Sequence, residues 1–426
     1  MQQIKNLPRQ FKPVRQKLQK LSQGFVKFKQ TLEKFPQVQR DRLFTLVLVL
    51  LLGFGGWYEY NEQAGNFDPE SFPVITPRTV QDIEVGFDLI ASGHQGVLSV
   101  AVNSDLTIAS GNKDGTLNLW NLESNSYKTM NKFEGQKIES VAFSPDSNIV
   151  ATGNSDGTIQ LWYHDSEKNT FNQSGEPLQT SAEAVLSVAF SPDGKILASG
   201  NSDGTIQLWN QDSQKNTFKL GEPLQTSADK TGAEAVWSVV FSPDGKILAS
   251  GSDNGILKLW DVEKRRETDS KPAHQDPIYS VAFSSAPSRS RFFLNLDKLD
   301  KQQLASGSYD GTIKLWNIDS SSSKKIQGTP KILTPHNQLL SIALSKDGKI
   351  LASGSDDGTI KLWNTLSGQP LRTLKSHPYG VLSLAFDGDS QTLVSGSYDE
   401  TVKVWRVRGK AKAGWKFPDI IKFYPN

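Results

Sequence analysis

The chain has 426 residues, 36% hydrophobic and 22% charged, so it is long enough and apolar enough to bury a large core. It has no cysteine, which excludes disulfides and thiolate chemistry, and its five histidines leave little to build a metal site from. The net charge is +2, yet residues 1–42 hold eleven Lys/Arg against two acids and residues 406–426 hold six against one. The middle must therefore carry −12, which disfavours nucleic-acid binding by the body and favours basic ends that meet an anionic surface.

Residues 1–42 are predicted to form a basic amphipathic segment. Their hydrophobic residues recur at heptad spacing, as Val14, Leu18, Leu21, Phe25, Phe28, Leu32 and Phe35, with lysines and arginines between them. Three interpretations compete: a helix lying on an anionic membrane, a short coiled coil, and a disordered basic arm. The first is favoured because the next segment brings a membrane close.

Residues 43–60 are predicted to be a transmembrane helix. The sixteen residues from Leu43 to Tyr58 lack any charge. As a helix they span about 24 Å, against a hydrocarbon core of about 30 Å. Arg42 at one end and Trp57, Tyr58 and Tyr60 at the other suit the two interfaces. The alternatives are a buried core helix and a cleaved signal peptide, and the long preceding segment disfavours the latter.

The charges on either side of this segment predict its orientation. Lys/Arg dominate before the uncharged run, and Glu59, Glu62, Asp68 and Glu70 follow it, so the positive-inside rule places the N-terminus in the cytoplasm and the rest outside. Residues 61–80, with Pro69, Pro73 and Pro77, are predicted to form an extended linker.

A repeat occupies residues 81–405. The segment KILASGSDDGTIKLWN, at residues 349–364, recurs with small changes and ends each time in a tryptophan: Trp120, Trp162, Trp209, Trp260, Trp316, Trp363 and Trp405. The spacing is 42 to 56 residues, and SPDG and Asp-Gly pairs mark turns between short apolar runs. Such a period is typical of a β-propeller.

These seven copies closely resemble the WD-repeat family, and bacterial, especially cyanobacterial, members of it. The resemblance implies an all-β, seven-bladed propeller, here preceded by the amphipathic helix and the transmembrane helix. Residues 83–94 have the character of an outer strand, and the repeat stops after Trp405. We therefore expect the N-terminal strand to complete the last blade and protect its edge.

The resemblance also implies buried polar networks of His, Ser, Asp and Trp within blades. Four complete sets are present: His94, Ser110, Asp114 and Trp120; His274, Ser306, Asp310 and Trp316; His336, Ser353, Asp357 and Trp363; His377, Ser395, Asp399 and Trp405. A hydrolase triad uses the same residue types. Because the set recurs from blade to blade, a structural network is favoured, and no enzymatic activity is expected.

Two positions in each repeat are expected to surround the mouth of the central channel and to contact partners, as the resemblance implies. The first lies just before the inner-strand serine and is Leu98, Glu139, Leu186, Trp237, Tyr279, Leu340 and Leu382. The second lies before the turn Asp. Trp237, Tyr279, Tyr309 and Tyr398 are the predicted partner-binding residues. For each leucine, packing between blades is favoured.

A second candidate surface comes from a departure from the repeat. Residues 284–303 interrupt blade five with a basic and apolar loop that contains Phe292 and Phe293. It is expected either to bind a partner on the opposite face or to cover its own blade. Residues 406–426 are expected to be a basic C-terminal tail.

These features predict a membrane-anchored, non-catalytic scaffold for protein–protein interaction, with protein partners, a membrane partner and no nucleic acid or cofactor. The alternative is an extracytoplasmic sensor that binds a small ligand at the channel mouth.

Overall fold

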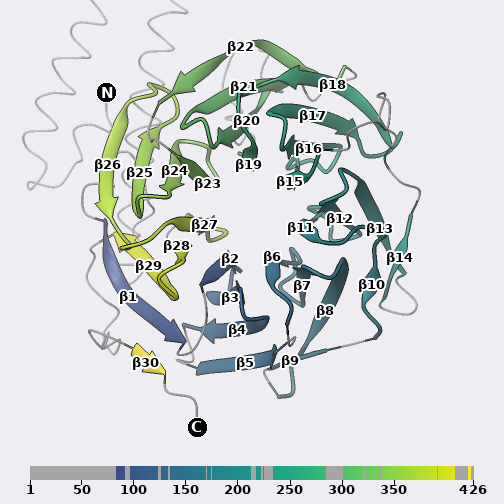
Figure 1. The fold of residues 1–426 in the computed structure, drawn as a ribbon, viewed down its shortest axis with the longest axis vertical. Coiled ribbons are helices and arrows are strands. Elements are labelled where there is room, and N and C mark those ends of the chain that lie inside the picture. The colour runs from purple at the N-terminus through teal and green to yellow at the C-terminus, as the bar shows by residue number, and fades with distance from the viewer. Residues whose placement is uncertain are drawn as a thin grey trace, which may run out of the picture. The chain divides into compact units, whose positions relative to one another are not determined.

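A computed structural model describes residues 83–91, 96–122, 126–132, 135–168, 170–173, 175–212, 217–221, 224, 234–284, 301–319, 323–334, 338–390, 392–407 and 421–423. Every regular element among these residues is a β-strand, and the strands form seven sheets arranged as blades around a central axis (Figure 1). The predicted seven-bladed all-β propeller is therefore confirmed. The amphipathic and transmembrane helices lie outside the described residues, among which no helix suited to crossing a membrane is found.

Each blade begins with its inner strand and continues outward in chain order. Blade one consists of β2 (Val97–Val102), β3 (Thr107–Asn112), β4 (Thr116–Asn121) and β5 (Ser126–Lys132). Blade two consists of β6 (Ile138–Phe143), β7 (Ile149–Asn154) and β8 (Thr158–Asp165), on which both β9 (Thr170–Gln173) and β10 (Leu178–Gln179) pair. Blade three consists of β11 (Val185–Phe190), β12 (Ile196–Asn201), β13 (Ile206–Asp212) and β14 (Thr217–Leu220).

The next three blades follow the same order. Blade four consists of β15 (Val236–Phe241), β16 (Ile247–Ser252), β17 (Ile256–Asp261) and β18 (Arg266–Pro272). Blade five consists of β19 (Ile278–Phe283), β20 (Lys301–Ser308), β21 (Ile313–Asp319) and β22 (Ile326–Leu333). Blade six consists of β23 (Leu339–Leu344), β24 (Ile350–Ser355), β25 (Thr359–Asn364) and β26 (Pro370–Lys375).

Blade seven joins the two ends of the repeat region. Its strands are β27 (Val381–Phe386), β28 (Thr392–Ser397), β29 (Thr401–Val407), β1 (Ile83–Ala91) and β30 (Ile421–Phe423), in that order. β1 pairs antiparallel with β29, from Ile83 opposite Val407 to Ile90 opposite Thr401. The prediction that the N-terminal strand completes the last blade is confirmed. β30 adds a fifth, parallel strand, which the sequence did not predict.

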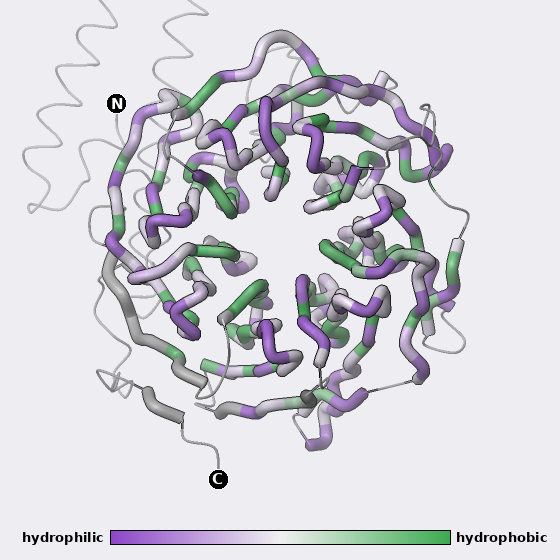
Figure 2. Tube along the Cα trace, viewed as in Figure 1, coloured by the Kyte–Doolittle hydropathy of each residue, from purple (hydrophilic) through white to green (hydrophobic). Residues whose placement is uncertain are grey.

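The hydrophobic core lies between blades. Seven clusters of buried residues each span one junction, and Leu89 from β1 contributes to the cluster between blades seven and one. Figure 2 shows hydrophobic residues interspersed with hydrophilic ones along the strands. Second strands such as β3 and β24 are buried along their whole length, because each blade packs between two neighbours. The repeated Ser-Gly of the second strand allows this close packing. A Cβ on Gly354 would lie 2.7 Å from the Val381 side chain of the next blade.

Hydrogen bonds also join neighbouring inner strands all the way round the ring. Each inner strand has one serine whose Oγ accepts a backbone N–H from the following blade, over 3.0 to 3.2 Å. The seven serines are Ser99, Ser140, Ser187, Ser238, Ser280, Ser341 and Ser383. In the last of these bonds, Val100 of blade one donates to Ser383 of blade seven, which closes the circle.

Candidate functional site

A bulge recurs in all seven inner strands. In blade one, Val97 pairs with Asn112 and Ser99 with Gly111, so Leu98 is left without a partner in the register. The same shift occurs at the corresponding place in every other blade. A bulge bends a strand and redirects a side chain. The bulged residues are Leu98, Glu139, Leu186, Trp237, Tyr279, Leu340 and Leu382.

These seven side chains, together with Tyr398, line a pocket of about 280 Å³. Because every blade supplies at least one lining residue, the pocket must lie on the axis of the ring, at one mouth of its channel. Tyr398 comes from a turn between second and third strands, which identifies the face. The sequence favoured packing between blades for each leucine of this set. The structure places Leu98, Leu186, Leu340 and Leu382 in the wall of the pocket. Leu340 of blade six also lies next to blade seven, where a Cβ on Gly380 would lie 3.2 Å from its side chain.

Three of the predicted partner-binding residues form an aromatic group on one side of the mouth. The Trp237 and Tyr279 ring centroids lie 5.1 Å apart at an interplanar angle of 82°, and those of Tyr279 and Tyr309 lie 5.7 Å apart at 83°. Such edge-to-face contacts stabilise the arrangement of the rings. Trp237 Nε1 donates to Asp253 Oδ1 over 2.8 Å, which fixes the indole further. Blades four and five thus present a preorganised aromatic surface.

Tyr398, the fourth predicted residue, lines the same pocket from blade seven and is 46% exposed. Burial raises its pKa, and the nearby carboxylates of Glu139 and Asp356 raise it further. The pKa of Tyr279 is likewise raised, first by burial and then by Asp253. Both phenols are therefore neutral at physiological pH and retain a hydroxyl that can donate to a ligand.

Glu139 is the one charged side chain that lines this pocket. Burial raises the pKa of its carboxyl group, and this effect exceeds the opposing one of Lys137. Glu139 occupies the same repeat position as Trp237 and Tyr279, but it is not among the predicted partner-binding residues. The available signal was a charge at a position that is otherwise apolar or aromatic.

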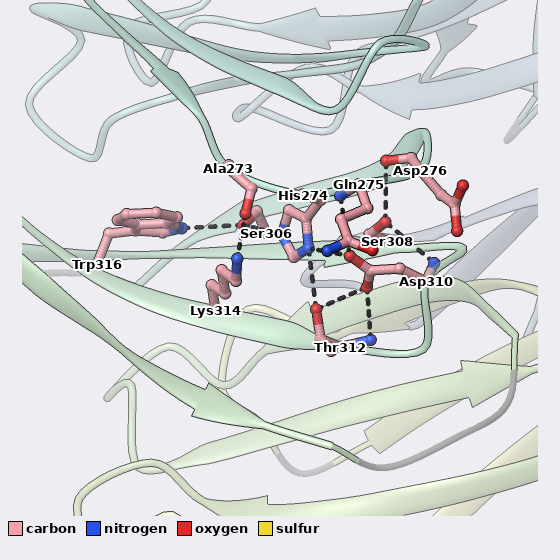
Figure 3. A network of polar contacts seen from close by, with 10 residues as sticks. All are labelled: Ala273, His274, Gln275, Asp276, Ser306, Ser308, Asp310, Thr312, Lys314 and Trp316. Atoms are coloured by element: carbon pink, nitrogen blue, oxygen red, sulfur yellow. Dashed lines mark hydrogen bonds and ion pairs between the residues drawn. The ribbon is translucent and has the colours of Figure 1, made fainter.

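The histidine of blade five forms a continuous hydrogen-bonded network (Figure 3). Trp316 Nε1 donates to Ser306 Oγ over 2.9 Å, and Ser306 Oγ lies 2.8 Å from His274 Nε2. His274 Nδ1 lies 3.2 Å from Asp310 Oδ2, while Thr312 donates to Asp310 Oδ1. One neutral tautomer satisfies the whole chain: the serine hydroxyl donates to Nε2 and the Nδ1 proton is donated to the carboxylate.

The burial of this network decides its chemistry. Burial lowers the pKa of His274 to about 4, although Asp310 acts in the opposite direction. The imidazole is therefore neutral at physiological pH, and its Nε2 is already occupied by a serine that also binds the tryptophan. The arrangement supports the structural interpretation of this set because His274, Ser306 and Trp316 are buried and hydrogen-bonded to one another.

The other three predicted sets are described to different extents. In blade seven, His377 lies 2.7 Å from Asp399 and 2.8 Å from Ser395, which accepts from Trp405 over 2.9 Å. In blade six, Trp363 donates to Ser353 over 3.0 Å, and Asp357 accepts from Thr359. In blade one, Ser110 and Trp120 are buried and Asp114 accepts from Thr116. His94 and His336 lie outside the described residues.

The tryptophan–serine bond also occurs where the repeat has no histidine. Trp260 donates to Ser250 over 2.9 Å in blade four, and Trp209 donates to Ser199 over 3.4 Å in blade three. This recurrence agrees with a structural role for the pair. Among the residues that the structure describes, no group of three or more metal-binding side chains is found. The second predicted surface, Phe292 and Phe293, lies outside these residues.

Comparison with known proteins gives the same repeats. The family model for the WD domain, G-beta repeat, matches residues 87–121, 127–163, 175–210, 221–261, 266–317, 328–364 and 368–406, which together exceed half of the chain. The matched segments correspond to the blades in their sequence order.

Individual relatives are similar over short stretches only. A probable cytosolic iron-sulfur protein assembly protein 1 from Cryptococcus neoformans is 32% identical over 130 residues, which cover 27% of each chain. The general transcriptional corepressor TUP1 of Saccharomyces cerevisiae is 37% identical over 62 residues, covering 15% of this chain and 9% of its own. Pre-mRNA-processing factor 19 of Bos taurus is 33% identical over 63 residues, covering 15% and 12%. All three are eukaryotic proteins, and the matched stretch spans about a quarter or less of each.

Proposed function

The chain belongs to the WD-repeat family, and on that premise we propose that it is a membrane-anchored, non-catalytic scaffold that binds protein partners at the channel mouth. The observation that carries the proposal is the pocket on the propeller axis, where Trp237 and Tyr279 are held by ring contacts and remain partly exposed. Aromatic side chains with a polar group contribute much of the binding energy in protein interfaces. WD-repeat propellers typically bind proteins, which supports this class of partner.

The relatives support the scaffold without indicating a pathway. Their names refer to iron-sulfur protein assembly, transcriptional corepression and pre-mRNA processing, three different processes. Non-catalytic action is supported by the neutral, occupied state of His274 and by the repetition of its network. The proposed absence of nucleic-acid partners rests on the −12 charge of residues 43–405.

Membrane anchoring and location are part of the proposal and rest on sequence outside the described residues. The uncharged run within 43–60 supports a single span, and the flanking charges support a cytoplasmic N-terminus with an extracytoplasmic propeller. Residues 1–42 would lie on the cytoplasmic lipid surface, and residues 61–80 would hold the propeller away from the bilayer. The near-uniform repeats support a bacterial, cyanobacterial-type protein.

The test uses the full-length chain as bait in cross-linked membranes. Changing Trp237 to Ala is expected to weaken partner binding by about 2 kcal/mol while the fold is kept, since the side chain is only partly buried and belongs to none of the His–Ser–Asp–Trp sets. Leu366→Ala is the matched control, because Leu366 is 87% exposed and lies on an outer turn of blade six. If the folded Trp237 variant captures the same partners equally well, or if the variant unfolds and its residual folded fraction still binds them unchanged, the mouth is not the binding site.

A small-ligand sensor is the second candidate, favoured by the pocket of about 280 Å³. Its volume lies just below the range of about 300–1,000 Å³ that is usual for small-molecule sites. A thermal shift with small molecules, without capture of any protein, would support the sensor over the scaffold.

A further inference from the structure

Glu139 brings a carboxylate into the wall of the pocket. Among the residues that the structure describes, none forms a hydrogen bond or ion pair with this side chain, although it is half-buried in the pocket. Lys137, on the same inner-strand segment, is the one charged residue that acts on it, and Lys137 is exposed and does not pair with it. A partly desolvated carboxylate with no counter-ion is costly, which is reflected in its raised pKa.

The surroundings of Glu139 suit a positive charge. On the far side of the pocket, Trp237 of blade four donates a hydrogen bond to the Asp253 carboxylate. The negative charges of Asp253 and Asp276 also act on Tyr279 of blade five and raise its pKa. On the blade-seven side, the negative charges of Glu139 and Asp356 act on Tyr398 and raise its pKa. Aromatic faces attract cations, most strongly where the contact is shielded from water. The pocket thus combines one carboxylate and three aromatic rings in its wall with further carboxylates that act on the two tyrosines.

We propose that the channel mouth receives one cationic side chain, from an arginine or lysine in an extended segment of a partner protein, with Glu139 as its counter-ion. This inference rests on the proposed function and specifies the chemistry of the partner. A volume of about 280 Å³ fits one long side chain better than a drug-sized molecule. The exposed ring of Tyr398 remains at the rim, where it can contact the chain on either side of that residue.

The probe is a set of degenerate heptapeptides, each with one fixed central residue and a terminal fluorophore. Binding of each pool to the full-length protein in detergent is measured by fluorescence anisotropy at pH 7. Pools with central Arg or Lys are expected to bind at least tenfold more tightly than pools with central citrulline, Gln or norleucine. Citrulline matches arginine in shape and lacks its charge.

Variants of Glu139 then connect this preference to the carboxylate. Glu139→Gln is expected to remove most of the tenfold preference, and Glu139→Lys to reverse it, so that pools with central Asp or Glu bind best. Glu263→Gln is the matched control, because Glu263 is exposed on a turn of blade four. Since burying the ionised Glu139 costs stability above its raised pKa, the Tm of Glu139→Gln should equal or exceed that of the natural protein.

The outcomes separate this inference from the proposed function. If peptides bind, are lost in Trp237→Ala and show no preference for a cation that Glu139→Gln alters, the inference is wrong and the scaffold stands. If the cationic pools bind equally well in the Trp237 and Glu139 variants, their site is elsewhere and both are wrong. Absence of binding by every pool also contradicts the inference.

Discussion

At the scale of single residues, the protonation of His274 makes part of the free energy of unfolding depend on pH. Its folded pKa of about 4 lies below the usual 6.5, so the unfolded chain binds a proton more readily than the folded one between these values. The stabilisation is therefore complete above about pH 6.5 and is lost as the pH falls toward 4. The shift corresponds to roughly 3 kcal/mol of acid destabilisation from this histidine.

His274→Ala is expected to lower the free energy of unfolding by about 2 kcal/mol at pH 7.5, because Ser306 and Asp310 each lose a buried partner. The difference from the natural protein should shrink as the pH falls from 6.5 to 4. Urea unfolding at several pH values measures both effects. His164→Ala, in which the lost ring packs only partly buried against Phe171, serves as the control. A difference that stays constant across this range would contradict the linkage.

His336→Ala is expected to behave similarly in blade six.

Individual residues of the pocket differ in how well the sequence could predict their role. Trp237 and Tyr279 could be placed at the mouth because the repeat aligns them with other blades, and their side chains are large and amphipathic. Glu139 could be placed in the same ring, but its significance depends on its burial and on its having no partner among the described residues. Those two properties arise only when seven inner strands converge, and no local pattern of residues records them.

At the scale of elements, β1 determines whether the ring closes. It pairs with β29 along its length and buries Leu89 between blades seven and one. Without it, β29 would expose a row of unpaired backbone groups.

Deletion of residues 83–91 is therefore expected to destabilise the propeller by several kcal/mol, measured as a loss of Tm and of chemical stability. The control is a permuted chain in which a two-residue Asn-Gly turn joins Val407 directly to Ile83. These two residues already face each other in the antiparallel register, so the turn needs little rearrangement. Recovery of stability in the permuted chain is expected. Equal stability of the deleted and natural proteins would show that the strand is dispensable.

Two element-scale features could not be read from the sequence. β30 is three residues long and lies within a basic tail that has no repeat, so neither its existence nor its parallel pairing with β1 follows from periodicity. The hydrogen bonds that join the inner-strand serines to the next blade could not be predicted from the sequence either. One serine per inner strand resembles an ordinary feature of the repeat until its neighbour in the next blade is placed beside it.

For the whole molecule, the sequence predicted the architecture well because each blade is one supersecondary unit with its own tryptophan and turns. Seven local patterns, each weak alone, agree on the same fold. The arrangement relative to a membrane depends on residues 1–80, which contain no such repetition. It therefore remains a prediction from hydropathy and charge.

Its test is protease protection in sealed vesicles of known sidedness. Protease added on the extracytoplasmic side should cut within residues 61–80 and leave residues 1–42 protected, because the positive-inside rule keeps the basic segment in the cytoplasm. An antibody tag at each end reports both products. Digestion of the basic segment alone would reverse the orientation, and a mature chain that begins near Trp57 would show a cleaved signal peptide.

The pairing of β1 with β29 also sets an order of events during synthesis. Ile90 pairs with Thr401, so about 310 residues must be translated after the first strand before its partner exists. At about 5–20 residues per second, the ribosome needs roughly 15 to 60 s for that interval. Throughout it, early blades can pack on one another while the ring stays open and β1 has nothing to pair with. A chain that terminates after most blades are made but before residue 401 never leaves this state and remains an open ring with exposed strand edges.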